Sequence, residues 1–342
     1  MRKLKDLIRQ HQFLILFLSS LLFLLTISGC SLLPSATSEI SSTGYPNEQL
    51  LASVDWLESR LDDPDLMIID MRREERYQDS HIPGAVHVPV SEITAVVDGV
   101  PFELEVDQTS ETLGRIGLTP ARTVVIYDNL GMMNSARFFW TLEYLGHQDV
   151  RILHGGWNQW QAAGKPTDGE TPAVNPSQYP VDPDSTRLVT ADQVLNSLGD
   201  PGVVILDARS PQEYTGEVAY ADRGGHIPGA LNLAWRDALT GGDTAYTTDS
   251  AWREELRDQD VEYFKPAREL ETLLSNSGLD SKDNRIITYC QTHWRGAHLY
   301  FLMRLMGYEN VQGYDGSWAE WGNDPDLPVV TGAQPGDYSP DN

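Results

Sequence analysis

The chain has 342 residues, of which 40% are hydrophobic and 22% charged, and its formal charge is −25. This length favours two domains, and the composition is that of a folded chain rather than a disordered one. An excess of acidic residues repels polyanions and argues against a nucleic-acid partner, while only two cysteines, Cys30 and Cys290, argue against a disulfide framework or a cysteine-rich metal site.

The N-terminal segment predicts export rather than a folded element. Basic residues among the first nine positions precede an almost unbroken apolar run from Phe13 to Ile27, which stops at Ser28-Gly29-Cys30. A basic start, a short apolar stretch and small residues are typical of a secretory signal peptide. The run is also short for a transmembrane helix, which needs about 20 apolar residues. A buried helix and an uncleaved anchor remain as alternatives.

The boundary Ile27-Ser28-Gly29-Cys30 resembles the lipobox of bacterial lipoproteins. The resemblance implies a signal peptide over residues 1–29 and an acylated Cys30. It also implies a protein that is anchored in the lipid bilayer and faces the extracytoplasmic side. More than one acyl chain gives stable anchoring where a single chain gives only marginal binding. The stretch 30–47 is rich in Ser and Thr and lacks periodicity, so it predicts a flexible tether.

The remainder of the chain contains one internal repeat. The sequence His-Ile-Pro-Gly-Ala occurs at 81–85 and again at 226–230, each time after an apolar run that ends in aspartate, Asp70 and then Asp207. Further along, the run 124–128 parallels 286–290, which aligns Asp128 with Cys290. The offset between the repeats then falls by one residue, so the loop after Asp128 is predicted to be one residue longer than the loop after Cys290.

Strands and helices are expected to alternate along both repeats. Short β-branched runs predict buried strands at 67–70, 123–127, 203–206 and 285–289. Helical patterns lie at 48–60, 134–145, 190–198, 266–276 and 296–306. This alternation predicts an α/β fold in which each repeat forms a mainly parallel sheet with helices on both faces.

Proline-rich and glycine-rich stretches mark the domain boundaries. Five prolines between 165 and 187 predict a linker over residues 167–187, which separates a first domain at 48–166 from a second at 188–331. The last residues, 332–342, are rich in Gly, Pro and Asp and predict a disordered tail.

The segment around Cys290 carries the clearest chemical signal. A predicted strand ends at Cys290 and a helix begins near Arg295, so successive backbone N–H groups of the loop are expected to point toward one centre. Such a nest, together with the positive end of a helix, stabilises an anion, and the thiolate is the nucleophilic form of cysteine. The alternative for a lone cysteine is a small buried apolar residue.

Two tandem α/β repeats with His-Ile-Pro-Gly-Ala and Asp-Gly-Ser-Trp motifs resemble the rhodanese family of sulfurtransferases. The resemblance covers about residues 48–331. It implies that Cys290 takes the outer sulfur of a small donor such as thiosulfate, holds it as a persulfide and passes it to cyanide or a thiol. No metal or organic cofactor is implied. Asp128 cannot form a persulfide, so the first domain would be non-catalytic and would form a wall of an interdomain pocket.

Several residues are candidates for binding the sulfur donor. They are Gln291, Thr292, His293, Trp294, Arg295 and Gly296 of the loop, with Arg209 and Arg223 from elsewhere in the second domain. The loop lacks the patterns typical of thiosulfate- or mercaptopyruvate-preferring members, so the donor stays open. His293 and Arg295 could supply positive charge. Alternatively, Arg295 ties the loop to its neighbours, Trp294 packs on the first domain, and Arg209 pairs with an acid such as Glu213.

The histidines of the repeated motif, His81 and His226, are predicted to be scaffold residues because one of them lies in the domain without a nucleophile. Four tryptophans at helical spacing are predicted to be core: Trp157, Trp160, Trp318 and Trp321.

Two other functions compete with sulfur transfer. One is a carrier that holds persulfide sulfur for a partner without turnover. The other is a phosphatase-like hydrolase. Four residues separate Cys290 from Arg295, whereas phosphatases of the related cysteine-loop kind have five, and no general-acid aspartate is recognisable by motif.

Overall fold

The computed structural model describes residues 44–97, 100–241 and 261–338. The predicted signal peptide, Cys30 and most of the predicted tether lie outside these residues. Among the described residues, no helix is both long and apolar enough to cross a membrane.

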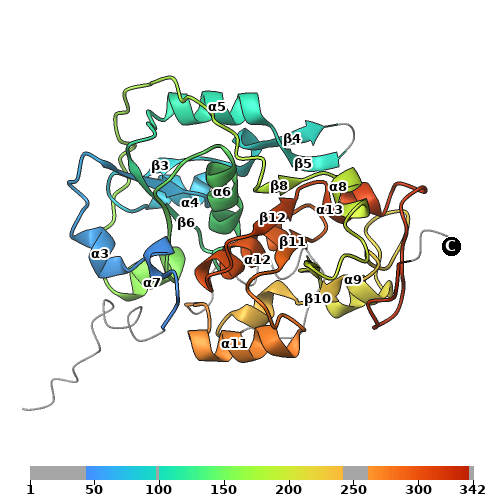
Figure 1. Cartoon of the computed structure of the whole chain (residues 1–342). Helices are drawn as coiled ribbons and strands as arrows, with labels where there is room; N and C mark the ends of the chain where they lie inside the picture. The colour runs from blue at the N-terminus through green and yellow to red at the C-terminus, as the bar shows by residue number, and fades with distance from the viewer. Residues whose placement is uncertain (1–43, 98–99, 242–260, 339–342) are drawn as a thin grey trace, which may run out of the picture. The chain divides into compact units, whose positions relative to one another are not determined.

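The first half of the described chain, blue to green in Figure 1, is built on a parallel sheet whose strand order is β1-β7-β6-β2-β3. Its strands are β1 (Leu51–Ala52), β2 (Leu66–Asp70), β3 (Val86–His87), β6 (Thr123–Tyr127) and β7 (Val150–Leu153). Its helices are α3 (Val54–Glu58), α4 (Glu74–Asp79), α5 (Val106–Arg115), α6 (Met133–Tyr144) and α7 (Gly156–Ala162), with 3₁₀ turns η1 (Glu48–Leu50) and η2 (Val90–Glu92). An antiparallel pair, β4 (Thr94–Val97) and β5 (Val100–Leu104), is inserted after η2.

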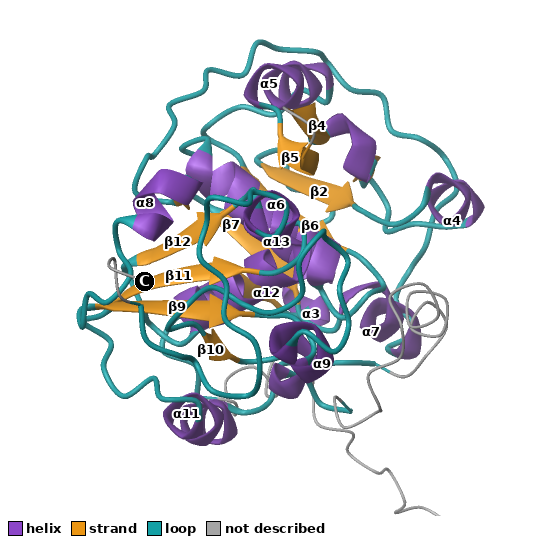
Figure 2. Cartoon of the chain, turned by 90° about the vertical axis from the view of Figure 1, so that its right-hand side faces the viewer, coloured by secondary structure: helices purple, strands orange, loops and turns teal. Residues whose placement is uncertain are grey.

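The second half repeats this topology, with the order β10-β9-β11-β12-β8 (Figure 2). Its strands are β8 (Leu188–Val189), β9 (Val203–Asp207), β10 (Leu231–Asn232), β11 (Arg285–Tyr289) and β12 (Val311–Tyr314). Its helices are α8 (Ala191–Leu195), α9 (Pro211–Thr215), α11 (Ala267–Asn276), α12 (Trp294–Leu305) and α13 (Ser317–Trp321), with a 3₁₀ turn η3 (Trp235–Ala238). The predicted fold class, two parallel α/β units, is confirmed.

Successive side chains of a strand point to opposite faces of its sheet. Apolar side chains on both faces of each sheet are buried in hydrophobic clusters. In β2, Met67 and Ile69 join the hydrophobic cluster that contains α6, whereas Leu66 and Ile68 join a second cluster with residues of α3 and α7. The four tryptophans predicted to be core are all buried, at the outer faces of the two sheets.

One hydrophobic cluster runs through both halves. Helix α6 of the first half packs against α12 of the second, and the rings of Phe139 and Phe301 meet edge to face with centroids 4.8 Å apart. A buried ion pair joins Arg137 on α6 to Asp315, which follows β12. The two helices that begin at the Asp128 loop and at the Cys290 loop therefore share one interior.

The predicted helix over 48–60 is wrong in its first half. Leu51 and Ala52 instead form β1, which pairs with Ile152 and Leu153 of β7, and a helix begins only at Val54 with Ser53 as its N-cap. A strand of two residues is too short to show an alternating pattern in the sequence.

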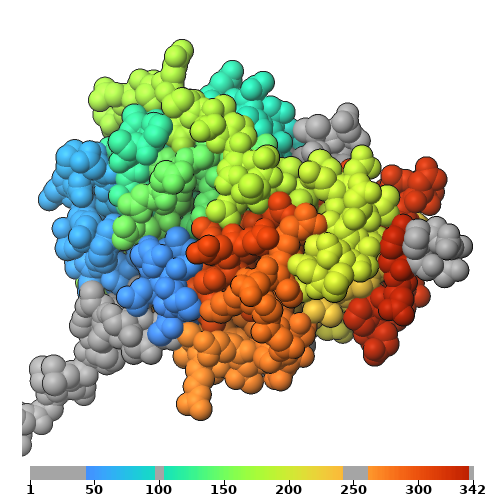
Figure 3. Space-filling model, viewed as in Figure 1, coloured from blue at the N-terminus to red at the C-terminus, as the bar shows by residue number. Residues whose placement is uncertain are grey.

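The ends of the described chain are also more ordered than predicted. Tyr45, placed in the predicted tether, is buried and donates a hydrogen bond to the Phe264 carbonyl over 2.8 Å, so the first residues of the described chain lie against the second half (Figure 3). At the other end, the N–H of Gly332 bonds to the Thr215 carbonyl and the Gln334 carbonyl lies 3.1 Å from His226 Nε2. The expectation of a disordered tail therefore does not hold for these residues.

Candidate functional site

Cys290 lies at the carboxyl edge of the second sheet, directly after β11, and only 1% of its surface is exposed. The loop that follows ends at His293, which caps α12 in a left-handed conformation with φ 59°. In the first half, Asp128 follows β6, and the loop ends at Met132, which caps α6 with φ 65°. The two loops therefore follow the same course, and the first is one residue longer, as the sequence predicts.

The carboxylate of Asp128 shows what this loop geometry does to an anion. One oxygen accepts hydrogen bonds from the N–H groups of Leu130, at 2.7 Å, and Met132, at 3.1 Å. The other accepts from the N–H and the hydroxyl of Ser135, at 2.7 and 2.9 Å. Burial raises the pKa of Asp128, and these hydrogen bonds oppose that shift. A buried carboxylate thus occupies a nest of converging donors.

The backbone of Cys290 is fixed by the loop after β12. Its N–H lies 3.3 Å from the hydroxyl oxygen of Ser317, and its carbonyl accepts the N–H of Trp318 at 2.9 Å. Ser317 is fully buried and has a φ of 53°, unusual for a residue with a side chain. The first half has Gly156 at the equivalent position, where a Cβ would lie 2.3 Å from the Asp128 carbonyl oxygen.

Sequence reasoning missed Ser317 as a residue of the site. The signal was present in the repeat, where Gly155-Gly156-Trp157 in one half becomes Gly316-Ser317-Trp318 in the other. At this position of the repeat, a serine hydroxyl thus occurs only in the half that contains Cys290.

Arg295 is engaged by a carboxylate rather than directed to a ligand. Its two terminal nitrogens donate to the two oxygens of Glu213, at 2.6 and 2.8 Å. Burial opposes the ionisation of Glu213, yet the charge of Arg295 and its hydrogen bonds hold the pKa of that carboxyl below its usual value. The geometry agrees with the alternative in which Arg295 ties the loop to its neighbours.

Arg209 occupies a buried position that the first half duplicates. Its guanidinium donates to both oxygens of Asp207 and to the Gly225 carbonyl. Arg72 holds Asp70 in the same way in the first half, where Asp128 stands at the position of Cys290. The prediction that Arg209 contacts an anion from the pocket rim therefore finds no support in the geometry, and its carboxylate partner is Asp207, not Glu213.

Arg223 also donates to protein groups, the carbonyls of Trp321, Gly322, Asp324 and Leu327. Its hydrogen bonds hold the segment after α13 against the insertion before His226. We therefore assign it a structural contact, although the sequence suggested a reach into the pocket.

His293 does not supply positive charge to the loop. Its ring is fully buried against Trp140, with centroids 4.7 Å apart, and among the described residues neither ring nitrogen has a hydrogen-bond partner. Burial, followed by the charge of Arg137, lowers the pKa of His293 well below its usual value. The imidazole is therefore neutral at pH 7.

The remaining loop residues divide between interface and surface contacts. Trp294 is buried, with the Arg137 guanidinium 5.5 Å from its ring, and thus packs toward the first half. The amide nitrogen of Gln291 donates to the Tyr220 carbonyl at 3.3 Å. His81 and His226 are buried and stack on Tyr77 and Tyr214, which confirms their predicted scaffold role.

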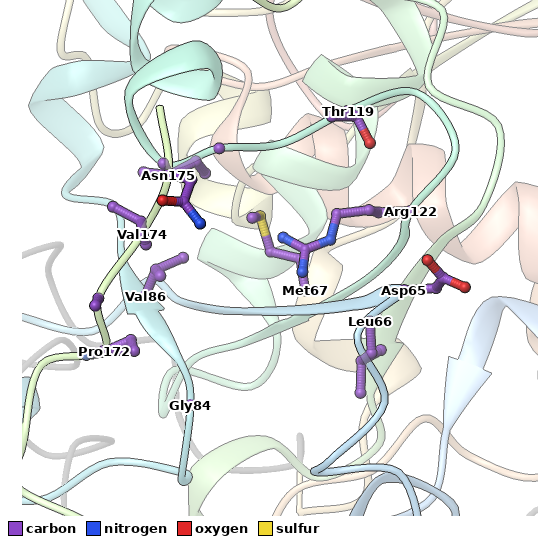
Figure 4. A pocket seen from close by; sticks show the side chains of 13 residues that line it. Asp65, Leu66, Met67, Gly84, Val86, Thr119, Arg122, Pro172, Val174 and Asn175 are labelled. Carbon is purple, nitrogen blue, oxygen red and sulfur yellow. The ribbon is translucent and has the colours of Figure 1, made fainter. Parts of the chain in front are cut away.

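Two pockets lie on opposite edges of the first sheet. One, of about 370 Å³, lies at the amino ends of its strands, where linker residues Pro172, Val174 and Asn175 face Leu66 and Arg122 (Figure 4). The guanidinium of Arg122 donates a hydrogen bond to the Pro64 carbonyl. The other, of about 420 Å³, lies at the carboxyl edge, beside the loops after β6 and β11. Ligands of open parallel sheets bind at the carboxyl edge.

No group of three or more His, Cys, Asp or Glu side chains in the described part of the chain is placed to hold a metal ion.

Comparisons with known proteins place this geometry in a family. The family model described as "Rhodanese-like domain" matches residues 53–163 and 190–324. A thiosulfate sulfurtransferase of Azotobacter vinelandii is 36% identical over 80% of this chain and 94% of its own. The sulfur carrier protein TtuD of Thermus thermophilus is 32% identical over 85% of this chain and 100% of its own.

A solved structure of similar fold is the anaerobic ergothioneine biosynthesis enzyme of Chlorobium limicola, in complex with trimethyl histidine. It is 25% identical, with a TM-score of 0.71 over 84% of this chain and 71% of its own. A structure of the protein titled EanB, also 25% identical with a TM-score of 0.70, contains a cysteine persulfide and ergothioneine. The match covers 83% of this chain and 71% of the other chain.

Proposed function

Because the chain belongs to the rhodanese family and has one rhodanese-like domain in each half, we propose that it is a sulfurtransferase that carries sulfane sulfur on Cys290. Sulfur transfer or carriage is what the names of its relatives share. The observation that carries the proposal is the nest around Asp128. A loop of the same course around Cys290 stabilises an anionic sulfur there, a thiolate before the reaction and a persulfide after it.

The repeat indicates which donors act on Cys290. The amides that hold the Asp128 carboxylate belong to Leu130, Met132 and Ser135. Their counterparts are the amides of Thr292, His293 and Gly296. We propose that these backbone groups, within the loop Gln291 to Gly296, bind the anionic sulfur. The guanidiniums of Arg209, Arg223 and Arg295 are bound to protein groups and are not part of this proposal.

The proposed reaction has two displacement steps. The Cys290 thiolate attacks the outer sulfur of thiosulfate, a new S–S bond forms, and the old S–S bond breaks with its electron pair leaving on sulfite. Cyanide or a thiolate then attacks the outer persulfide sulfur and releases the Cys290 thiolate. This is covalent catalysis of the ping-pong type, and no net oxidation state changes in the protein.

The first half is proposed to be non-catalytic. A carboxylate occupies the position of the nucleophile in its loop, and the N–H donors that would bind a persulfide are already used by Asp128. Its contribution to the site is the α6 surface, against which α12 and the Cys290 loop pack.

A carrier function is the second candidate, and the relative named as a sulfur carrier protein favours it. In that case Cys290 loads a sulfur atom but small acceptors do not remove it. Since Cys290 is almost fully buried, a partner protein could be needed to expose the persulfide.

The test uses the chain without residues 1–29. Incubation with thiosulfate should add one sulfur atom to Cys290, detected by intact mass, and subsequent cyanide should release thiocyanate repeatedly. Cys290→Ser should abolish both signals, whereas the matched variant Asp128→Asn, at the equivalent position of the other loop, should retain them if it folds. Loading without turnover would select the carrier, and loading that persists in Cys290→Ser would overturn the proposal.

We also propose that the protein is anchored in a bacterial membrane through an acylated Cys30 and faces the extracytoplasmic side. The support is the lipobox-like sequence before Cys30. The intact mass of protein extracted from membranes should lack residues 1–29 and include acyl chains, and Cys30→Ser should release the protein from the membrane fraction. A full-length chain without acylation would contradict the anchoring.

A further inference from the structure

The ring of His293, at the end of the Cys290 loop, lies in a narrow slot between α12 and β12. It is fully buried. A Cβ atom on Gly296 of α12 would lie 2.6 Å from its Nδ1, and a Cβ atom on Gly313 of β12 would lie 2.3 Å from its Nε2. Both distances are shorter than a Cβ atom allows, so the ring fits only because both residues are glycines.

Trp140 of the first half closes this slot. Its indole meets the imidazole of His293 edge to face, with ring centroids 4.7 Å apart and planes at 72°. The indole N–H donates to the Arg187 carbonyl at 2.9 Å, and the same carbonyl accepts the N–H of Gly313 at 2.9 Å. Trp140 is therefore fixed to the second half at the point where it contacts the ring of His293.

The repeat shows that the slot is specific to one half. Three positions around it differ: Met132, Ser135 and Ile152 in the first half correspond to His293, Gly296 and Gly313 in the second. The first of these pairs keeps its backbone conformation, because Met132 and His293 both have a positive φ, 65° and 59°. The other two pairs lose a side chain in the second half, on the two sides of the imidazole. The slot is therefore a feature of the half that contains Cys290.

Stability alone does not account for a histidine in this slot. Among the described residues neither ring nitrogen has a hydrogen-bond partner, and a buried polar group without a partner lowers stability. An apolar side chain would avoid this cost, and Met132 shows that such a loop accepts one. The imidazole differs from methionine in being flat and rigid, whereas methionine has three rotatable bonds and adapts its shape. An unsatisfied buried group of this kind calls for a functional explanation.

The ring is tied to two of the N–H groups that are proposed to bind the anionic sulfur, those of His293 and Gly296. One of them belongs to the same residue as the ring, and the other belongs to the glycine beside Nδ1. Cys290 and Trp140 are members of the same hydrophobic cluster, so the two rings lie on the same face of the sheet as the sulfur. A shift of the imidazole would therefore move both N–H groups relative to Cys290.

We propose that His293 and Trp140 act together as positioning residues for sulfur transfer, with the two rings holding the N–H groups of His293 and Gly296 in place around Cys290. The inference rests on the proposed function and goes beyond it in assigning the first half a part in the reaction. Trp140 acts on the loop across the interface between the halves, although its own half has Asp128 at the position of the nucleophile.

The test compares pH profiles of the chain without residues 1–29. Sulfur loading from thiosulfate is followed by intact mass, and alkylation by iodoacetamide is followed on the peptide that contains Cys290. His293→Ala and Trp140→Leu each remove one ring. Because misplaced N–H groups stabilise the thiolate less, loading at pH 7 should slow about tenfold, and the half-maximal rates of both reactions should move about one pH unit upward. The two rings act as one unit, so the double variant should resemble the slower single variant.

Matched variants separate positioning from a general loss of stability. Met132→Ala removes the equivalent side chain of the other loop, and it should lower the urea midpoint without moving either pH profile. Trp140→Phe keeps an aromatic ring at this position, and its loading rate should stay within about threefold of the unchanged chain. His293→Met supplies the first half's residue without a ring and should show the same upward shift as His293→Ala, so the ring is tested even where alanine prevents folding.

Circular dichroism identifies the folded variants. Unchanged pH profiles in folded variants that lack either ring would overturn the proposal, as would an equal shift in Met132→Ala. Alkylation requires no sulfur donor. If the unchanged chain fails to load sulfur, the proposed function fails, while the alkylation profiles still decide whether the two rings position the loop around Cys290.

Discussion

The ion pair between Glu213 and Arg295 gives the sharpest test of how the Cys290 loop is held. The two side chains are 5% and 9% exposed, and two hydrogen bonds of 2.6 and 2.8 Å join them. The perturbation is a double-mutant cycle made of Glu213→Gln, Arg295→Met and the combination of both. Glutamine keeps the oxygen that accepts the Ser210 N–H, so the capping box of α9 can survive.

The expected magnitudes follow from burial. Removing one partner leaves the other charge buried without its partner in this pair, which costs about 3–5 kcal/mol of the free energy of unfolding. Removing both takes away both charges of the pair, and comparable replacements of buried pairs by neutral side chains are close to neutral in free energy of unfolding. The double variant should therefore be more stable than either single variant, with a coupling energy of at least about 3 kcal/mol.

Urea denaturation of all four chains measures this coupling. The control is the same cycle on Glu92 and Arg115, an ion pair whose side chains are 35% and 55% exposed, where we expect less than about 1 kcal/mol. Sulfur loading of Cys290 is the second readout, and the double variant should retain it. Additive destabilisation would refute the structural role of the pair. A stable double variant that no longer loads sulfur would indicate that Arg295 contacts the anionic sulfur donor.

Three further predictions concern the same framework. Ser317→Ala leaves the Cys290 N–H without its acceptor, so we expect the free energy of unfolding to fall by about 1–3 kcal/mol and sulfur loading to slow. Ser317→Gly should lose less stability because glycine relieves the positive φ. Equal loading rates in the unchanged chain and both variants would contradict this. Burial lowers the pKa of His154 to about 4, below its unfolded value near 6.5. The stability from its neutral form is therefore complete above pH 6.5 and falls by about 3 kcal/mol toward pH 4. His154→Leu should flatten the pH dependence of the urea midpoint, and an unchanged pH dependence would count against a buried neutral ring. Arg137→Met leaves Asp315 buried without its partner between the halves, so the free energy of unfolding should fall by about 3–5 kcal/mol, and a fall below 1 kcal/mol would show that the pair does not hold them together.

The fold was largely readable from the sequence because its central strands are buried on both faces. Such strands are continuous apolar runs, and the runs at 67–70, 123–127, 203–206 and 285–289 became β2, β6, β9 and β11. Neither the edge strands nor two interior strands, β7 (Val150–Leu153) and β12 (Val311–Tyr314), were recognised. Leu51–Ala52 and Leu188–Val189 are two residues long, so their only signature is the partner strand that they join in space.

The site was readable in part. The position of Cys290 between a strand and a helix is a local property, and the sequence contains it. The carboxylate with which each arginine pairs cannot be read from the neighbouring sequence. Arg295 and Glu213 lie 82 residues apart in the chain, and neither segment contains a pattern that predicts its contact with the other. Sequence reasoning therefore left Arg295 and Arg209 open between contact with an anion and pairing with an acid, whereas the folded chain pairs both with carboxylates.

The repeat supplies a comparison that a single domain could not. Two loops of the same course leave parallel sheets of the same topology, and each is followed by a helix that packs against the helix of the other half. In one loop the first residue is Asp128, whose own carboxylate fills the nest of N–H groups. In the other it is Cys290, whose shorter side chain ends in a single sulfur. The Asp128 carboxylate accepts three backbone N–H groups and the Ser135 hydroxyl. Gly296 replaces Ser135 in the second half, so the three N–H groups remain, and one sulfur leaves part of them for a second atom. In the proposed reaction, the outer sulfur of the persulfide is that second atom. The difference between the two side chains would then let one scaffold hold a structural anion in its first half and a transferable sulfur in its second.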